Sequence, residues 1–181
     1  CDARGEVEKV EEWALNKLRS CREPEEIHNS PLLLNFCLQR IRDVACPLAA
    51  DEEGFRPFKS CIPGHKIMVN VDGSLAICDK CETLKIGHIQ SGLDTEGIEQ
   101  IISQWQETLN DDCLNCWASD FCRACYLVAW DGEKFNREQL ERFCAAFRHR
   151  TEKWLEVYLT LNNRNVHFFD FLDEIDEKLV G

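Results

Sequence analysis

The sequence contains three Cys-x-x-Cys pairs, and thiols at this spacing have a specific chemistry. The pairs are Cys78/Cys81, Cys113/Cys116 and Cys122/Cys125. A two-residue turn lets both sulfurs face the same side. Such a pair therefore coordinates a metal ion well but makes a poor structural disulfide. Thiolates are preferred ligands of zinc and of iron–sulfur clusters. The pairs therefore indicate a centre that holds a metal ion or a cluster.

The total of twelve cysteines in 181 residues permits two broad explanations. One is a disulfide framework in an oxidising compartment, and the other is metal ligation in a reducing one. Disulfide-dense domains are usually small and have little core. This chain has five tryptophans and long amphipathic helical patterns. Ligation is therefore favoured, and a secreted disulfide protein is the least favoured hypothesis.

The cysteines also follow an ordered pattern over a longer stretch. It reads C-x11-G-x4-C, a gap, C-x2-C-x5-C-x2-C, a second gap and a last C. Its members are Cys61, Gly73, Cys78, Cys113, Cys116, Cys122, Cys125 and Cys144. Together with Pro63-Gly64 and the hairpin sequence VNVDGSLAIC, this pattern resembles the SPASM domain. That domain is the C-terminal module of radical S-adenosylmethionine enzymes that mature peptides and sulfatases, and the resemblance covers about residues 57–145.

The resemblance implies two auxiliary [4Fe–4S] clusters with interleaved ligands. The first cluster would be held by Cys61, Cys78 and Cys125, and the second by Cys113, Cys116, Cys122 and Cys144. For the fourth ligand of the first cluster we choose Cys81, with Cys46 as an alternative and an open iron site as another. The family implies electron relay and engagement of a peptide or protein substrate.

Two departures from the family pattern concern Cys125. The last close pair is usually separated by three residues, whereas two separate Cys122 from Cys125. The glycines common near this step are replaced by Arg123, Ala124 and Tyr126. The shorter step could move Cys125 from the first cluster to the second.

Zinc is the alternative to clusters. Two Cys-x-x-Cys pairs, Cys78/Cys81 and Cys113/Cys116, could form a tetrahedral site, which would make the chain a zinc-stabilised interaction module without a redox role. That site leaves Cys61, Cys122, Cys125 and Cys144 unexplained. Clusters are therefore favoured, although zinc could replace them in protein handled in air.

The radical-generating motif C-x3-C-x2-C is absent from the sequence. We therefore expect the chain to be inactive alone and S-adenosylmethionine to bind an N-terminal domain of the same enzyme. The start at Cys1 and the single methionine, Met68, also suggest a piece of a longer protein. No Ser/His/Asp set or phosphate-binding glycine loop is found, so we name no catalytic residue.

Charge and hydropathy limit the partners. A net charge of −12 argues against nucleic acid and anionic membranes, which attract basic surfaces. No apolar run approaches the ~20 residues of a membrane span, and no secretory leader is visible. These features predict a cytoplasmic protein.

The pattern predicts an α+β fold, mainly helical, with a small β-hairpin and cysteine-rich cluster-binding loops. We expect helices over 4–20, from Ser30-Pro31 to about 41, over 94–109 and from Asn136 to about 161. Alternating Ile67, Val69 and Val71 lead into Asp72-Gly73, which favours a tight hairpin turn. The predicted organisation is a helical lead-in over 1–56, the twin-cluster domain over 57–145 and a helical extension over 146–181.

Helical spacing also predicts the core. The residues expected to face inward are Val7, Val10, Trp13, Ala14, Leu18, Leu33, Phe36, Cys37, Ile41, Ile98, Ile101, Ile102, Trp105, Leu109, Leu140, Phe143, Cys144, Phe147, Trp154 and Tyr158. Cys21 and Cys37 have no partners by spacing and are interpreted as buried thiols. The tail HFFDFLDEIDEKLV is interpreted as packing on the domain, with partner docking as the alternative.

Overall fold

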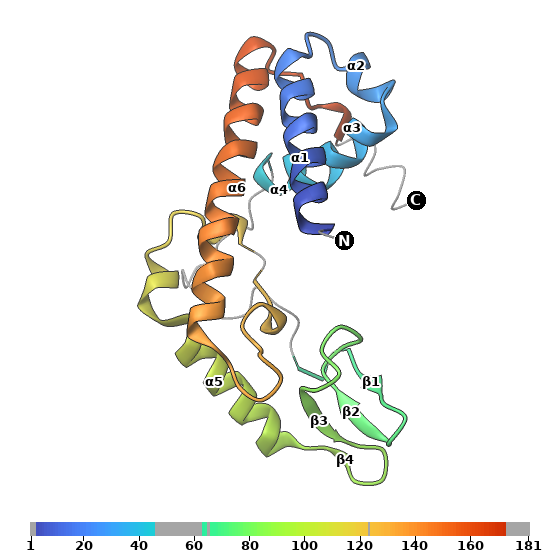
Figure 1. The fold of residues 1–181 in the computed structure, drawn as a ribbon, viewed down its shortest axis with the longest axis vertical. Coiled ribbons are helices and arrows are strands. Elements are labelled where there is room, and N and C mark those ends of the chain that lie inside the picture. The colour runs from blue at the N-terminus through green and yellow to red at the C-terminus, as the bar shows by residue number, and fades with distance from the viewer. Residues whose placement is uncertain (1–2, 46–62, 65, 123, 173–181) are drawn as a thin grey trace. The chain divides into compact units, whose positions relative to one another are not determined.

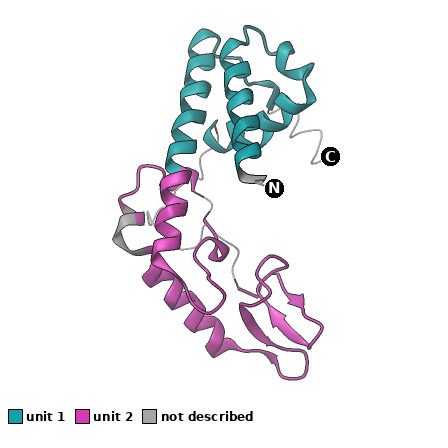
Figure 2. Cartoon of the chain, in the orientation of Figure 1, with its two compact units in different colours: residues 1–48, 148–181 teal, residues 49–147 magenta. Residues whose placement is uncertain are grey.

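The computed structural model describes residues 3–45, 63–64, 66–122 and 124–172. The chain divides into two compact units (Figure 2): residues 1–48 with 148–181, and residues 49–147. The described residues form helices and one four-stranded antiparallel sheet (Figure 1), so the fold is α+β and mainly helical, as predicted.

The first unit is built from helices. They are α1 (Ala3–Ser20), α2 (Glu25–His28), α3 (Pro31–Phe36), the π-helical turn η1 (Cys37–Ile41), α4 (Arg42–Ala45) and the later part of α6 (Arg137–Arg164). Pro31 occupies the first position of α3, where its missing N–H costs nothing. This start agrees with the predicted one.

The core of the first unit joins segments from both ends of the chain. Its fully buried members include Leu15 and Leu18 of α1, and Trp154 and Leu161 of α6. The carboxylate of Glu11 accepts hydrogen bonds from Trp154 Nε1 at 2.8 Å and from Arg150 Nε at 3.2 Å. The N-terminal and C-terminal segments, which were predicted to be separate parts of the chain, thus share one core.

The inward stripe predicted for α1 is wrong in its first half. Val7, Val10 and Trp13 are 61%, 42% and 39% exposed, whereas Ala14 and Leu18 are buried as expected. Leu15, which the prediction omitted, is 1% exposed. The helix therefore turns its Ala14–Leu15–Leu18 side to the core.

The tail packs on the first unit as far as it is described. Phe168, Phe169, Phe171 and Leu172 are buried. The ring of Phe171 meets that of His28 edge-on, with centroids 4.7 Å apart. The packing interpretation therefore holds for these residues, and the rest of the tail lies outside the described part.

The second unit contains the sheet. Its strands are β1 (Met68–Val69), β2 (Ser74–Ala76), β3 (Lys85–His88) and β4 (Gly92–Leu93), paired antiparallel in the order β1-β2-β3-β4. The predicted hairpin is formed by β1 and β2, with Val69 opposite Leu75. Strands β3 and β4 were not predicted.

The turn of this hairpin depends on Gly73, whose φ is 82°. Its N–H donates to the Asn70 carbonyl at 2.9 Å, and a Cβ at this position would lie 2.9 Å from His88 Nε2. Asp72 Oδ1 accepts hydrogen bonds from the Ser74 N–H and hydroxyl, at 2.9 and 2.6 Å. These hydrogen bonds fix the turn that connects β1 to β2, the strand that precedes Cys78.

The alternation along residues 67–71 is present, but its apolar side faces outward. Ile67, Val69 and Val71 are exposed. Asn70, between them, is half-buried, and its amide donates to Ser74 Oγ at 3.0 Å and to the Glu82 carbonyl at 3.1 Å. A polar network thus occupies the inner side of this segment.

Helix α5 (Thr95–Leu114) packs beside the sheet and supplies most of the helical core of the second unit. Ile101, Trp105 and Leu109 are buried in one apolar cluster with Leu75, Ile77, Cys81, Leu84, Ile86, Tyr126, Ala129 and Leu140. We call this set the unit 2 core. The helix ends at Leu114, not at the predicted 109, so Cys113 belongs to a helix and not to a loop.

Across the described residues, the structure has no helix that is both long and apolar enough to cross a bilayer.

Candidate metal centre

Two successive tight turns position Cys78 and Cys81 directly after β2. The Cys81 N–H donates to the Cys78 carbonyl at 3.2 Å, and the Leu84 N–H donates to the Cys81 carbonyl at 3.2 Å. The Ile77 N–H returns to the Leu84 carbonyl at 3.1 Å, which closes the loop between β2 and β3. Cys81 is 4% exposed and Cys78 is half-buried. The hairpin therefore delivers both thiols to the edge of the unit 2 core.

Cys125 approaches this pair from a distant segment. Burial raises the pKa of the Cys81 thiol because a thiolate loses hydration there, and nearby Cys78 and Cys125 raise it further by repulsion between like charges. A hydrogen bond from the Leu84 backbone opposes this rise in pKa. Cys78 and Cys125 thus each lie within electrostatic range of Cys81.

The backbone holds Cys125 in place through the aromatic residue that follows it. Cys125 precedes the 3-10 turn η3 (Tyr126–Val128), and its carbonyl accepts the Val128 N–H at 3.0 Å. The Tyr126 ring is buried 5.3 Å from the Trp105 ring and 6.0 Å from the Phe135 ring, between centroids. This aromatic packing anchors the segment that carries Cys125.

The other predicted ligands follow the end of α5. Cys113 lies in its last turn, and the Cys116 N–H donates to the Cys113 carbonyl at 3.4 Å. The Ser119 N–H then donates to the Cys116 carbonyl at 2.9 Å, and the Cys122 N–H donates to the Ser119 carbonyl at 3.0 Å. Consecutive tight turns therefore compact the segment from Cys113 to Cys122.

Cys144 comes from α6, in the part that belongs to the second unit. Its side chain is half-buried and packs against the unit 2 core, as does that of Cys113. The expectation that Cys144 lies on the inward side of its helix agrees with this position. Helix α5, the turn segment and α6 thus each bring a thiol of the second predicted set to the second unit.

The predicted ligands that are described lie in the second unit, but they are not arranged to hold a metal ion. In the described part of the chain, no group of three or more Cys, His, Asp or Glu side chains has an arrangement that could hold a metal ion. Cys61, and the alternative ligand Cys46, lie outside the described residues. Cys81 belongs to the unit 2 core, and Cys78, Cys113 and Cys144 pack against it.

Trp105 adds an observation that the sequence analysis missed. Its side chain is 1% exposed, yet its Nε1 has no hydrogen-bond partner among the described residues. Buried indole N–H groups usually find an acceptor. Helical spacing identified Trp105 only as a core residue, and no sequence pattern reveals whether its N–H has a partner.

The histidines near these cysteines have structural roles where they are described. His88 Nε2 lies 3.1 Å from the Asp72 carbonyl, and His88 Nδ1 accepts the Gln90 N–H at 3.2 Å. These contacts tie the two hairpin turns together. His65, the other histidine near the cluster-binding segments, lies outside the described residues.

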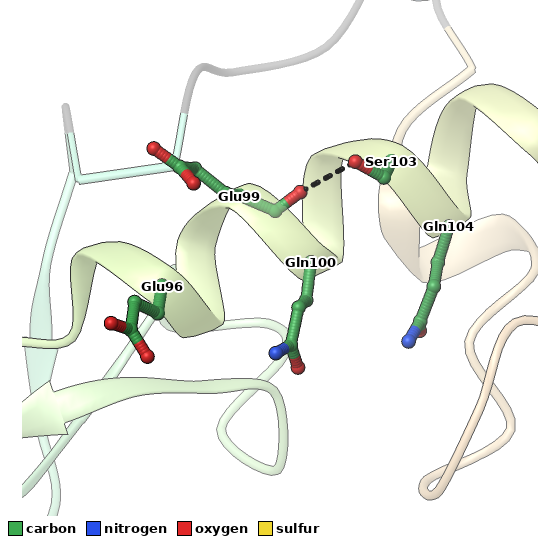
Figure 3. A pocket seen from close by; sticks show the side chains of 5 residues that line it. All are labelled: Glu96, Glu99, Gln100, Ser103 and Gln104. Carbon is green, nitrogen blue, oxygen red and sulfur yellow. Dashed lines mark hydrogen bonds between the residues drawn. The ribbon is translucent and has the colours of Figure 1, made fainter.

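A surface pocket on α5 contains no thiol. Figure 3 shows its lining side chains, Glu96, Glu99, Gln100, Ser103 and Gln104, all from one helix. The Ser103 hydroxyl donates to the Glu99 carbonyl of the same helix at 2.9 Å. Acidic and amide groups along a single helix do not by themselves define a binding site.

Comparisons of the chain with protein-family models, with curated proteins and with solved structures find no match. The interpretation of the site therefore rests on the residues of this chain.

Proposed function

We propose that this chain is the auxiliary-cluster domain of a radical S-adenosylmethionine enzyme that modifies a peptide or protein in the cytoplasm. The observation that carries the proposal is that Cys78 and Cys125 each lie within electrostatic range of Cys81. These cysteines come from separate segments, and the SPASM-like pattern assigns Cys78 and Cys125 to one cluster. Thiols contributed by two separate segments are expected of a ligand set.

We assign Cys61, Cys78, Cys81 and Cys125 to the first [4Fe–4S] cluster. Cys81 is the fourth ligand because it is buried beside Cys78 and within electrostatic reach of Cys125. The same proximity supports keeping Cys125 in the first set, despite the shortened step from Cys122.

The second cluster is assigned to Cys113, Cys116, Cys122 and Cys144. Cys113 and Cys144 pack against the unit 2 core from α5 and α6, respectively. The compact turns between Cys113 and Cys122 bring the middle ligands to the end of α5. Helix α6 supplies the final thiol from a rigid element, which favours fixed ligand geometry.

Bound clusters would supply one-electron transfer to or from the substrate radical. The residues of the chain provide thiolate donors and an apolar wall of Ile77, Leu84 and Tyr126, which restricts water. Burial, local charge and hydrogen bonds to sulfur set the potential of such a cluster. S-adenosylmethionine and the radical-generating cluster belong to the proposed N-terminal domain.

A zinc-stabilised interaction module is the second candidate. The observation in its favour is that Cys78, Cys81 and Cys113 border the unit 2 core, and a tight turn joins Cys116 to Cys113. Two such pairs could share one ion. It predicts a colourless protein that stays folded in air.

The test is anaerobic reconstitution of the 181-residue chain with iron and sulfide, with zinc present in a parallel sample. We expect about eight iron and eight sulfide per chain, the content of two [4Fe–4S] clusters. Reduction should then give the paramagnetic resonance signals of two clusters. One tightly held zinc per chain, with no stable iron in either sample, would replace the cluster proposal by the zinc module.

A further inference from the structure

Strand β1 is an outer strand of the sheet, and within the described residues it pairs with β2 alone (Figure 1). The Asn70 N–H donates to the Ser74 carbonyl at 2.9 Å, which directs the backbone groups of Asn70 toward β2. Hydrogen-bonding direction alternates along an antiparallel pair, so Met68 also faces β2. The N–H and C=O of Val69 therefore point to the open edge, where another strand can pair with them.

The side chains along this edge are apolar and exposed. Ile67, Val69 and Val71 are 46%, 58% and 112% exposed, respectively. Asn70, between them, is held on the other side by its hydrogen bonds to Ser74 and Glu82. An exposed apolar row beside unpaired main-chain groups is typical of a strand that pairs with another chain.

The segment is complementary to itself. When two copies run antiparallel about a two-fold axis through Val69, Ile67 of each copy faces Val71 of the other. The same register places Lys66, which is exposed, beside Asp72 of the other copy. Asp72 pairs with Lys85 at 3.1 Å, but its side chain is 60% exposed and stays accessible. Opposite charges across neighbouring strands stabilise their pairing, and the two-fold axis makes each contact twice.

We propose that β1 pairs antiparallel with β1 of a second copy of this chain and forms a symmetric dimer. The Val69 N–H of each copy then donates to the Val69 carbonyl of the other, because both groups point to the edge. The contacts of Ile67 with Val71 remove exposed apolar surface from water. This inference does not rest on the proposed function, since the pairing needs neither a metal ion nor a cluster.

Sedimentation velocity of the metal-free 181-residue chain, with a reductant that keeps the cysteines as thiols, tests the dimer. We expect a monomer–dimer equilibrium that shifts toward dimer as the concentration rises. Val69→Pro removes the N–H that faces the edge and no bond to β2, so it should prevent dimer formation. Val69→Ile keeps the N–H and the branched apolar side chain, and it should remain dimeric as the matched control.

The charged contact is tested by substitutions at Lys66. Lys66→Glu places a carboxylate beside Asp72 of the other copy at both ends of the interface. The dissociation constant of the dimer should rise by about 2–30-fold, as expected for two lost cross-strand pairs. Lys66→Arg keeps the charge and should leave the dissociation constant unchanged.

The register of the two strands is tested by NMR. Met68 is the only methionine of the chain, so carbon-13 methionine labels a single site. The proposed register makes Met68 and Asn70 of the other copy a pair without mutual hydrogen bonds, whose Cα atoms lie about 4.5 Å apart. In a mixture of labelled and unlabelled chains, an isotope-filtered experiment should therefore show a nuclear Overhauser effect between the Hα atoms of these residues.

Three outcomes would overturn the inference. A wild-type chain that stays monomeric at all concentrations would leave the open edge to a strand of another protein. A dimer that is unaffected by Val69→Pro, or that lacks the effect between Met68 and Asn70, would form through another surface. Circular dichroism checks that Val69→Pro is folded, and if it is not, Lys66→Glu and the NMR measurement still decide.

Discussion

Cys81 and Cys125 lie within electrostatic reach of one another: burial chiefly raises the pKa of the Cys81 thiol, and repulsion from Cys78 and, less strongly, from Cys125 adds to this rise. Cys81 follows a β-hairpin, and Cys125 immediately precedes the short 3-10 turn η3. Their approach gives the cysteine pattern a testable geometry, because residues that serve one centre respond to mutation as a unit.

The first prediction concerns this pair. Cys81→Ser and Cys125→Ser should each lower the iron content by about four per chain, since each removes a ligand of one [4Fe–4S] cluster. The double variant should lose no more iron than either single one. Iron analysis after anaerobic reconstitution measures all three variants.

Two control variants test whether the loss of iron is specific to one cluster. Cys81→Ser combined with Cys113→Ser should abolish both clusters, because these residues are assigned to different ones. Cys37→Ala should retain full iron, since Cys37 is buried in the first unit. Additive losses for Cys81 and Cys125 would show that they belong to separate centres.

The second prediction concerns stability at alkaline pH. Burial, with a smaller repulsion from Cys21, raises the pKa of Cys37 to about 12. The folded chain then keeps this proton between pH 9 and 12, while the unfolded chain releases it. The free energy of unfolding should therefore fall in this window, by up to about 1.4 kcal/mol per pH unit.

Urea unfolding of the metal-free chain from pH 8 to 11, followed by circular dichroism, measures this effect. Cys37→Ala should flatten the alkaline slope, whereas Cys116→Ala should keep it because Cys37 is still present. An unchanged slope in Cys37→Ala would assign the alkaline loss of stability to other groups.

The third prediction compares two glycines of the sheet. Both have positive φ, 148° at Gly87 and 81° at Gly92. A Cβ at Gly87 would clash with the Gly92 carbonyl oxygen, whereas a Cβ at Gly92 meets nothing within 4 Å. Gly92→Ala should cost about 1–2 kcal/mol through backbone strain. Gly87→Ala should cost about 1–3 kcal/mol more through the clash.

Urea unfolding of both variants measures the difference, with Gly92→Ala as the control for backbone strain alone. Equal losses of stability would contradict the close approach of β3 to β4 at Gly87.

The fourth prediction concerns the turn that precedes Cys78. Hydrogen bonds from the Ser74 hydroxyl and N–H, followed by one from Lys85, hold the pKa of Asp72 well below its usual value. Because this pKa is depressed on folding, its stabilising effect is present above about pH 4 and is lost as the pH falls further. Carbon-13 carboxyl NMR should find Asp72 ionised when ordinary aspartates have become protonated.

Ser74→Ala should move the Asp72 pKa toward its usual value more than Lys85→Gln does, since the Ser74 hydroxyl is the strongest cause of the shift. A larger response to Lys85→Gln would mean that the ion pair, not the turn, controls this carboxylate.

The fold was predictable where local chemistry decided it. Asp72-Gly73 predicted the hairpin, and Ser30-Pro31 predicted the start of α3. The end of α5 was placed too early because Asn110-Asp111-Asp112 has low helix propensity, yet the helix continues to Leu114. The inward half of α1 was also misplaced, since apolar spacing alone did not distinguish Val7 and Val10 from Leu15.

The candidate site was only partly accessible from the sequence. Spacing shows that Cys78 and Cys81 form a local pair, whereas the approach of Cys125 to Cys81 was expected only from the family resemblance. That relationship depends on how β2, α5 and η3 pack around Tyr126. The unpartnered N–H of Trp105 is likewise a property of the folded core, because the residues next to Trp105 in the sequence do not show whether an acceptor is within reach.

The separation of Cys81 from Cys125 along the chain also has a consequence for biogenesis. At ~5–20 residues per second, the ribosome needs on the order of several seconds after making Cys81 before it adds Cys125. A centre that requires both thiols, as proposed above, can therefore be completed only after Cys125 has been added to the chain.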